Sequence, residues 1–143
     1  MTVCVLGMAV WSCGDDDDKD TVIGYDTLPA QARTFISTYY HGVSVRTVER
    51  KTDDGVVEFE VKFQNGHDVT FDSAGLWTDV DAPSGQTIPS GIVPAAVAVY
   101  VDTRYPGVGI NEISRDARGY EVNLVDGTDL LFDPAGNFIG LDR

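Results

Sequence analysis

The sequence predicts an α+β fold: a tandem repeat of a helix plus a four-stranded antiparallel meander, with the two sheets joined into one and both helices on one face. Three observations predict it. Two segments match each other in order, each opens with apolar residues at helical spacing, and alternating apolar and polar residues follow in both. The 143 residues suffice for one domain, or for two small units that share a core.

The repeated segments are residues 28–81 and 93–143, with residues 82–92 as the joint between them. The copies differ in length at the turn of residues 51–55, where a duplicated unit tolerates an insertion easily. One copy buries too little apolar surface to be comfortably stable alone, so we expect the two sheets to join edge to edge. Corresponding positions are Gly66 and Gly127, Phe71 and Phe132, Gly75 and Gly136, and Trp77 and Phe138.

Apolar stripes predict a helix at the start of each copy, over residues 28–39 and 93–105. Asp26 and Thr27 come just before the first helix and are expected to cap it. The stripes are Leu28, Ala32, Phe35, Ile36 and Tyr39 in the first copy, and Val93, Val97, Tyr100 and Val101 in the second.

Alternation of apolar and polar residues predicts the strands. Val61 and its alternate neighbours point to one side, which is typical of an antiparallel sheet with one buried face. The turn at Gly66 must hold an odd number of residues to keep Val69 on the buried side, which favours a three-residue loop with a left-handed glycine. The apolar phase shifts after Val45 and again after Ile110, and predicts a bulge in both copies.

Residues 1–12 are predicted to be a secretory signal, because an apolar run ends in small residues. Residues 10–13 resemble a bacterial lipobox, in which cleavage before the cysteine is followed by lipidation, so Cys13 is the predicted lipidation site. Residues 13–27 would then be an acidic tether, and their aspartates resemble the export signal of some gut gram-negative lipoproteins. The resemblance implies an outer-membrane lipoprotein facing the periplasm or the cell surface, with the lipid anchor as its only membrane contact.

Other interpretations of the N-terminus stay open. Residues 3–10 could form a buried strand with Cys4 and Cys13 paired, and residues 15–19 match a common protease-cleavage sequence. Trp11 is bulky where a lipobox has a small residue, and no Lys or Arg precedes the apolar run, so the start codon could lie upstream.

Beyond the N-terminus, the chain resembles the PepSY-like, β-lactamase-inhibitor-like family of bacterial envelope proteins. The resemblance rests on residues 120–122 (Tyr-Glu-Val), 126–127 (Asp-Gly) and 132–133 (Phe-Asp) after a helix, and on the same order in the first copy. It covers residues 28–142 and implies a tandem helix-plus-sheet architecture in a secreted or lipid-anchored protein. It implies no known ligand, since a fold by itself confers no activity.

Composition and motifs argue against several classes of function. The net charge of −13 disfavours nucleic-acid binding, which rests on cationic neutralisation of phosphates. His41 and His67 lack partners at metal-ligand spacing and are interpreted as solvated turn residues. Asp72 and Asp133 open turns, so we interpret them as turn-capping residues and not as a catalytic pair. The sequence therefore predicts no enzyme, no catalytic or metal-binding residue and no cofactor.

The outward face of the sheet is the surface with functional promise, and most of its residues are polar or acidic. We expect this face to bind another protein, and the binding could inhibit that protein. The acidic residues would attract a basic partner to the face. The alternative is a small-ligand accessory protein, for a glycan or a metal, in an envelope uptake system. The candidate partner-binding residues are Glu58, Glu60, Lys62, Thr70, Glu121, Asn123, Val125 and Leu131, with Asp68 and Asp129 on the same face.

Four hydrophobic residues need a separate expectation. Val125 and Leu131 are expected to form a small apolar centre on the outward face, because contiguous exposed apolar side chains indicate a contact patch. Trp77 and Phe138 are expected in the core; an exposed Trp77 would instead indicate a binding anchor. A face that is simply solvated is the default for an antiparallel sheet and stays open here.

Overall fold

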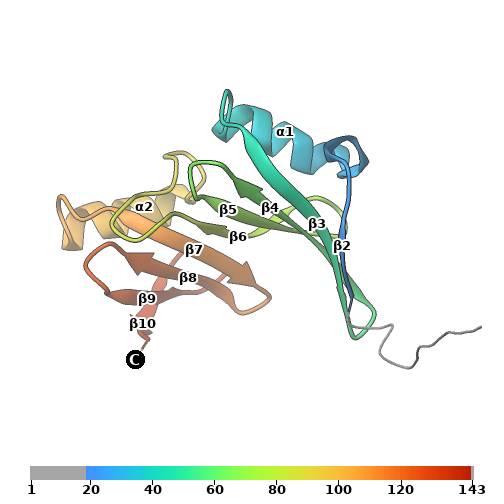
Figure 1. The fold of residues 1–143 in the computed structure, drawn as a ribbon. Helices are drawn as coiled ribbons and strands as arrows, with labels where there is room; N and C mark the ends of the chain where they lie inside the picture. Colours follow the sequence, from blue (N-terminus) through green and yellow to red (C-terminus); the bar gives the residue numbers. More distant parts are fainter. Residues whose placement is uncertain (1–18, 143) are drawn as a thin grey trace, which may run out of the picture.

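The computed structural model describes residues 19–142, which form an α+β fold with two helices and one open antiparallel sheet of nine strands (Figure 1). The strands lie across the sheet in chain order, from β2 at one edge to β10 at the other. The predicted class is confirmed, and the sheet has one strand more than expected. The strands are β2 (Lys19–Val22), β3 (Val45–Asp53), β4 (Val56–Phe63), β5 (Asp68–Asp72), β6 (Trp77–Asp81), β7 (Ile110–Asp116), β8 (Gly119–Leu124), β9 (Asp129–Phe132) and β10 (Phe138–Leu141).

The additional strand, β2, lies within the segment that the sequence assigns to an acidic tether. It pairs antiparallel with β3, with Val22 opposite Glu49, and a 3₁₀ helix (Tyr25–Thr27) follows it. Side-chain periodicity gives no signal for this strand, because Val22 is 70% exposed and main-chain hydrogen bonds hold the strand in place. The predicted lipidation site, Cys13, and the predicted signal segment lie outside the described residues.

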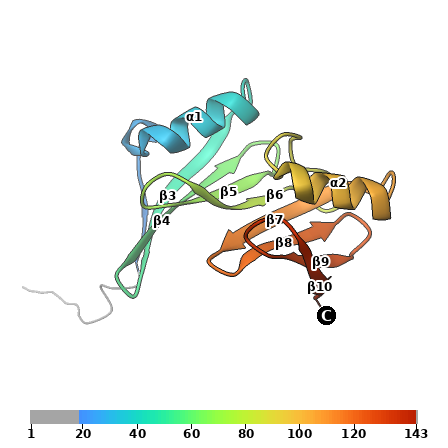
Figure 2. The same ribbon diagram turned by 180° about the vertical axis from the view of Figure 1, so that it is seen from behind.

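Both helices lie on the same side of the sheet, with α1 over the strands that follow it and α2 over the later strands (Figure 2). Each begins directly after a proline, Pro29 or Pro94, whose fixed φ suits a first turn. The predicted capping by Asp26 and Thr27 is wrong, since the N-terminus of α1 has no side-chain cap. The helices are α1 (Ala30–Tyr39) and α2 (Ala95–Arg104).

The core lies between the sheet and the helices, and alternate strand residues build it. Val61 and Val122 are fully buried on this side. Their neighbours Glu60 and Glu121 point to the opposite face, because successive side chains of a strand alternate. The expected orientation of the two faces is confirmed. The fully buried side chains are Val61, Phe63, Val69, Phe71, Val80, Val97, Val101, Ile113, Val122, Leu130 and Phe132.

Aromatic contacts hold each helix to the strands below it. Phe35 of α1 meets Phe71 of β5 edge to face, with ring centroids 5.4 Å apart. Tyr100 of α2 meets Phe132 of β9 in the same way at 5.5 Å. Edge-to-face aromatic pairs stabilise a fold beyond the effect of the apolar area that they bury, and they prefer a defined geometry. These contacts therefore set the position of each helix along its strands.

The turns follow the local sequence. The β3–β4 hairpin turns through Asp54 and Gly55, both at positive φ (52° and 78°), as a two-residue turn of this type requires. Gly66 is left-handed (φ 91°) in the loop after β4, as the parity of the flanking strands predicts. The register shifts after Val45 and after Ile110, so the two predicted bulges are present.

Strands β6 and β7 pair at the middle of the sheet. Val80 lies opposite Ile113, and both side chains are fully buried. The side-chain amide of Asn111 fastens the joint to β7, because its Nδ2 donates hydrogen bonds of 2.9–3.0 Å to main-chain oxygens there. The acceptors are the carbonyl oxygens of Ala82, Pro83 and Gln86.

Trp77 is half-buried against the core, whereas Phe138 is exposed, so the expected core position is wrong for Phe138. The guanidinium of Arg115 covers the Trp77 ring at 4.1 Å, and its Nε donates a 2.7 Å hydrogen bond to the Trp77 carbonyl oxygen. Phe138 stacks on Tyr100 with centroids 4.4 Å apart and remains 37% exposed. Trp77 is therefore occupied by an intramolecular cation–π contact.

His67 is buried, which corrects the interpretation of both histidines as solvated turn residues. Its side chain is 8% exposed and its Nδ1 lies 3.0 Å from the hydroxyl of Tyr40. Burial lowers the pKa of His67. A hydrogen bond with Gln86 and the charge of Asp81 act in the opposite direction, but more weakly. His41 is exposed, as expected. The position of His67 beside a turn is predictable from the sequence, whereas its contact with the Tyr40 ring is not.

Candidate functional site: the acidic open face

The centre of the open face is acidic, and it lies where β6 meets β7. Asp79 and Asp81 flank the buried Val80 on β6, and Glu112 precedes the buried Ile113 on β7. Their side chains point away from the helices, because they alternate with core residues. The strand register places Asp81 directly opposite Glu112, so carboxylates from both halves of the sheet meet here.

The carboxyl groups at this centre hold their protons more tightly than usual. Burial and the hydrogen bond and charge of Glu112 raise the pKa of Asp79 to about 8. Burial also raises the pKa of Glu112 and of Asp81. Because ionised carboxylates repel one another and burial disfavours charge, Asp79 and Glu112 ionise less readily than isolated carboxyl groups would.

A second pair of carboxyl groups extends the acidic surface onto β4 and β5. Burial and a hydrogen bond to Glu60 raise the pKa of Asp68 to about 7. Burial opposes ionisation of Glu60 as well, but bonds from Asp68 and Lys51 outweigh it and lower its pKa. The Nζ of Lys51 lies 2.6 Å from Glu60 Oε1, so Glu60 is the charged member of this pair.

Cations do not neutralise the centre of the face. Within residues 19–142 the two ion pairs are Lys51 with Glu60 and Arg118 with Asp116. Neither includes Asp79, Asp81 or Glu112. The centre is therefore a group of partly buried acids without an ion-pair partner in the described part of the chain.

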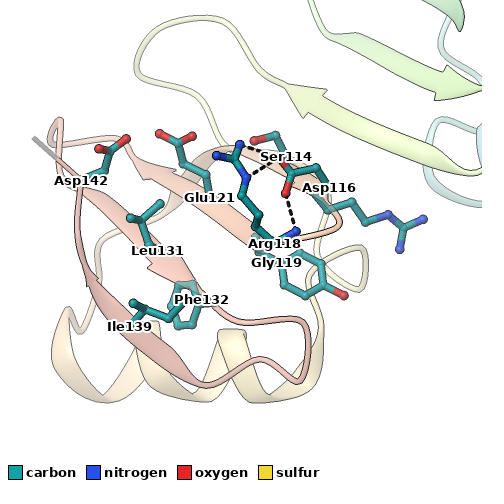
Figure 3. A pocket seen from close by; sticks show the side chains of 11 residues that line it. Ser114, Asp116, Arg118, Gly119, Glu121, Leu131, Phe132, Ile139 and Asp142 are labelled. Atoms are coloured by element: carbon teal, nitrogen blue, oxygen red, sulfur yellow. Dashed lines mark hydrogen bonds and ion pairs between the residues drawn. The ribbon is translucent and has the colours of Figure 1, made fainter. Parts of the chain in front are cut away.

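At the far end of the face, β8, β9 and β10 border an open pocket of about 350 Å³. Figure 3 shows the carboxylates of Glu121 and Asp142 on one rim, and Leu131 and Ile139 beneath them. A hydrogen bond to Asp142 raises the pKa of Glu121, and burial adds to this effect. The guanidinium of Arg118 lies between Glu121 and Asp116 in Figure 3, and Asp116 holds it at 2.8 Å. The pocket thus combines an apolar floor with carboxyl groups.

The structure places the predicted partner-binding residues in two groups on this face. Strands β4 and β5 carry the first group and β8 and β9 the second. Strands β6 and β7 lie between them, so three strand spacings, about 14 Å, separate β5 from β8. The first group is Glu58, Glu60, Lys62 and Thr70, and the second is Glu121, Asn123 and Leu131.

The expected apolar centre of the face is not formed, because its two residues lie apart. Val125 is in the turn after β8 and is 37% exposed. Leu131 lies opposite Glu121, and the hydrogen-bonded pair Asn123–Asp129 comes between the two positions. Leu131 instead adjoins Ile139 in the pocket at the end of the face.

The candidate residues missing from the sequence interpretation are the central ones: Asp79, Asp81, Glu112 and Asp142. A signal for three of them exists, since each alternates with a buried aliphatic residue of its own strand. The bulge beside Glu112 and the register shift within β6 interrupt the alternation of apolar and polar residues. The sequence pattern therefore does not show that these acids share a face with the residues of the neighbouring strands. Only the order of the strands reveals that these residues meet.

The described residues assemble no recognisable catalytic constellation. Asp72 and Asp133 accept hydrogen bonds of 2.8–3.0 Å from main-chain N–H groups of their own turns, which confirms their capping role. Over residues 19–142, no group of three or more His, Cys, Asp or Glu is placed to hold a metal ion. No helix in that range is long and apolar enough to cross a bilayer.

Together, the fold and the face define a small α+β protein with helices on one side of an open sheet and carboxyl groups on the other. A family model described as "Putative beta-lactamase-inhibitor-like, PepSY-like" matches residues 11–62 and 57–140. The chain belongs to this PepSY-like family, as the sequence motifs indicated. No curated protein matches the chain.

Three solved structures of similar proteins come from Bacteroides. A "putative calcium-regulated periplasmic protein" from Bacteroides thetaiotaomicron is 36% identical over 91% of this chain and all of its own, with a TM-score of 0.83. Two from Bacteroides vulgatus are described as putative periplasmic proteins. One, of unknown function, is 28% identical over 87% of this chain and all of its own (TM-score 0.83). The other, of the DUF2874 family, is 35% identical over 92% of this chain and all of its own (TM-score 0.82). These relatives support a location in the cell envelope.

Proposed function

We propose that this protein is a non-catalytic binding module of the bacterial envelope that binds a basic protein partner through the acidic open face. The observation that carries the proposal is the group of partly buried carboxyl groups without an ion-pair partner at the centre of that face. Burial of acids without a cation opposes folding, so a function that uses their charge explains their presence. A basic partner would neutralise them and lower their raised pKa values.

The open geometry favours a protein over a small molecule as the ligand. The central acids lie on strands in the middle of a sheet whose outer face neither α1 nor α2 covers (Figures 1 and 2). Small ligands are bound in concave sites that bury most of their surface, whereas protein interfaces are broad. Glu58, Glu60, Lys62, Thr70, Glu121, Asn123 and Leu131 would then form the two flanks of the interface, with Val125 at its rim.

The proposal includes the placement of the protein. The lipobox at residues 10–13 and the acidic segment after it support attachment to the outer membrane through a lipid on Cys13. We propose the domain organisation accordingly: a signal segment (1–12), a tether that ends before β2, and two sheet-forming segments (28–81 and 93–143) with the joint 82–92. Mass spectrometry of the mature N-terminus tests the lipid, and an unmodified Cys13 in the mature chain contradicts it.

Affinity co-purification from envelope extracts tests the binding role. The informative variant is Asp79→Asn with Glu112→Gln, which removes charge from the centre while keeping side-chain shape. The matched control is Asp26→Asn with Asp102→Asn, which removes the same charge from exposed sites away from the centre of this face. We expect the native protein and the control variant to recover the same partner, and the central variant to recover about tenfold less of it. High salt should release the partner from the native protein. Equal recovery by both variants contradicts the proposal.

A second candidate function is metal binding, and one observation favours it. The Bacteroides thetaiotaomicron relative is described as calcium-regulated, and carboxylate oxygens are the ligands that Ca²⁺ prefers. Against it, the described residues form no ready group of three ligands. Calcium titration followed by calorimetry separates the two proposals. A saturable heat that Mg²⁺ does not reproduce, and that the central variant abolishes, would favour the metal.

A further inference from the structure

The two edges of the sheet differ in chemistry. Strand β2, at one edge, includes the charged Asp20, whereas none of the four residues of β10 at the other edge is charged. Native proteins protect free edges with charged residues, because unpaired N–H and C=O groups otherwise accept a strand from another chain. On β10, Ile139 is 61% exposed and Leu141 is 49% exposed. The edge at β10 therefore lacks the usual protection by charge.

The chain itself shows what kind of strand fits such an edge. At the spacing that matches Gly75 with Gly136, Val80 of β6 corresponds to Leu141 of β10. Val80 is fully buried because β7 pairs with β6 and places Ile113 opposite it. In β10 the corresponding side is open, since the sheet ends there. An antiparallel strand with an apolar residue facing Leu141 would complete β10 as β7 completes β6.

The backbone of β10 is oriented for this pairing. The N–H of Asp142 donates a 3.0 Å hydrogen bond to the Asp129 carbonyl oxygen, toward β9. Because the polar groups of successive strand residues point to opposite sides, the N–H and C=O of Leu141 point to the open edge. In β6 the N–H of Ala82 donates to Asn111 of β7, so Val80, two residues earlier, faces β7 in the same way.

Two open pockets flank β10 and would receive side chains of the added strand. The first, with Ile139 and Glu121, lies on the open face; the second, of about 440 Å³, is lined by Leu141 and Asp129. Asp142 lines both. In strand addition, main-chain hydrogen bonds supply affinity and pockets for alternate side chains supply specificity. Two arginines also line the first pocket, but Arg115 is held against Trp77 and Arg118 against Asp116. The remaining carboxylates, Glu121 and Asp142, favour basic side chains.

We propose that the free edge of β10 binds an extended, basic segment of another protein, which pairs antiparallel with β10 and places lysine or arginine side chains against Glu121 and Asp142. The basic character of the segment rests on the function proposed above, whereas the strand pairing does not. A second copy of this chain is the weaker occupant, because each copy carries a net charge of −13 and would bring its own carboxylates to the seam.

The test uses the full mature chain, with short synthetic peptides as probes. The binding peptide alternates lysine with valine, and its control has a central valine replaced by proline. Both carry the same charge, but the proline peptide cannot form a continuous ladder of main-chain hydrogen bonds. On the protein, Leu141→Pro removes the N–H that faces the open edge, and Leu141→Ala retains it.

We expect the alternating peptide to bind at least about tenfold more weakly to Leu141→Pro than to Leu141→Ala, and the proline peptide to bind the native protein more weakly by a similar factor. The peptide comparison needs no variant, so it decides the matter even if Leu141→Pro fails to fold. Equal binding of both peptides, or no binding of either, overturns the strand pairing. If both peptides bind equally and the Asp79→Asn, Glu112→Gln variant abolishes that binding, the peptides bind the acidic face and not the edge at β10. That outcome overturns the strand pairing but supports the function proposed above.

Sedimentation equilibrium excludes or identifies the other occupant. If the native protein forms a dimer that Leu141→Pro abolishes, the edge binds a second copy, and the proposal of a basic partner at β10 is overturned. A monomer at all concentrations, together with peptide binding that depends on Leu141, supports it.

Discussion

The two faces of the sheet consist of neighbouring residues of the same strands, yet their chemistry is opposite. On β6, Val80 is fully buried against the helices, while Asp79 and Asp81 beside it face away from them. The inner face excludes water and stabilises the fold, and the outer face gathers acids whose partial burial opposes folding. Stability therefore depends on the inner residues of each strand, and their outer neighbours can be changed without disturbing the core.

The largest expected effect comes from neighbouring substitutions on the two faces. Ile113→Ala leaves a cavity in the core, and we expect it to lower the free energy of unfolding by about 2–5 kcal/mol. Glu112→Ala, one residue away, removes a repelling carboxyl group, and we expect no loss of stability at neutral pH. Chemical denaturation of both variants measures the difference. Equal losses would show that the two faces are not separable.

The next effect is a loss of stability as the pH rises. The folded-state pKa values of Asp68 and Asp79, about 7 and about 8, lie above those of the unfolded chain. The unfolded state therefore releases these protons first, and stability is lost as the pH rises through the folded-state values. We expect the melting temperature to fall between about pH 6.5 and about pH 8.5, where burial of His67 contributes little. A melting temperature that rises over this range contradicts the acidic centre.

The double variant Asp79→Asn, Glu112→Gln sharpens that test. Both replacements are neutral at every pH, so we expect the fall in melting temperature to become shallower and the variant to match or exceed the native protein in stability near pH 8. The control Asp26→Asn, Asp102→Asn should keep the native slope. If the central and control variants have the same pH dependence, the titrating groups lie elsewhere.

The smallest effect concerns the ion pair on the open face. Lys51 is about one-third exposed and pairs with Glu60 at 2.6 Å. An exposed pair contributes about 0–1 kcal/mol, so we expect Lys51→Met to change the free energy of unfolding by no more than that. A loss as large as that of Ile113→Ala would mean that the open face carries part of the stability of the fold.

Local rules anticipate much of the fold. Alternation around Val61 and Val122 predicts which face is buried, the phase shifts predict the two bulges, and Gly66 predicts a loop conformation. Strand β2 is missed because main-chain hydrogen bonds hold it and its side chains leave no apolar pattern.

The site is harder to predict, because its residues meet only through pairing between strands distant in sequence. Asp81 and Glu112 lie opposite each other across the β6–β7 pairing, and Glu121 meets Asp142 across the end of the sheet. No spacing along the chain indicates these contacts. His67 is misjudged for the same reason, since Tyr40 reaches it from the end of α1.

The most direct measurement is the number of protons released when a basic peptide binds near pH 7, obtained from calorimetry in buffers with different ionisation enthalpies. We expect a net release in the native protein and in Asp26→Asn, Asp102→Asn, because an incoming cation lowers the raised pKa values at the centre of the face. We expect little release, and weaker binding, in Asp79→Asn, Glu112→Gln. Unchanged binding without proton release in that variant would show that the cation binds elsewhere.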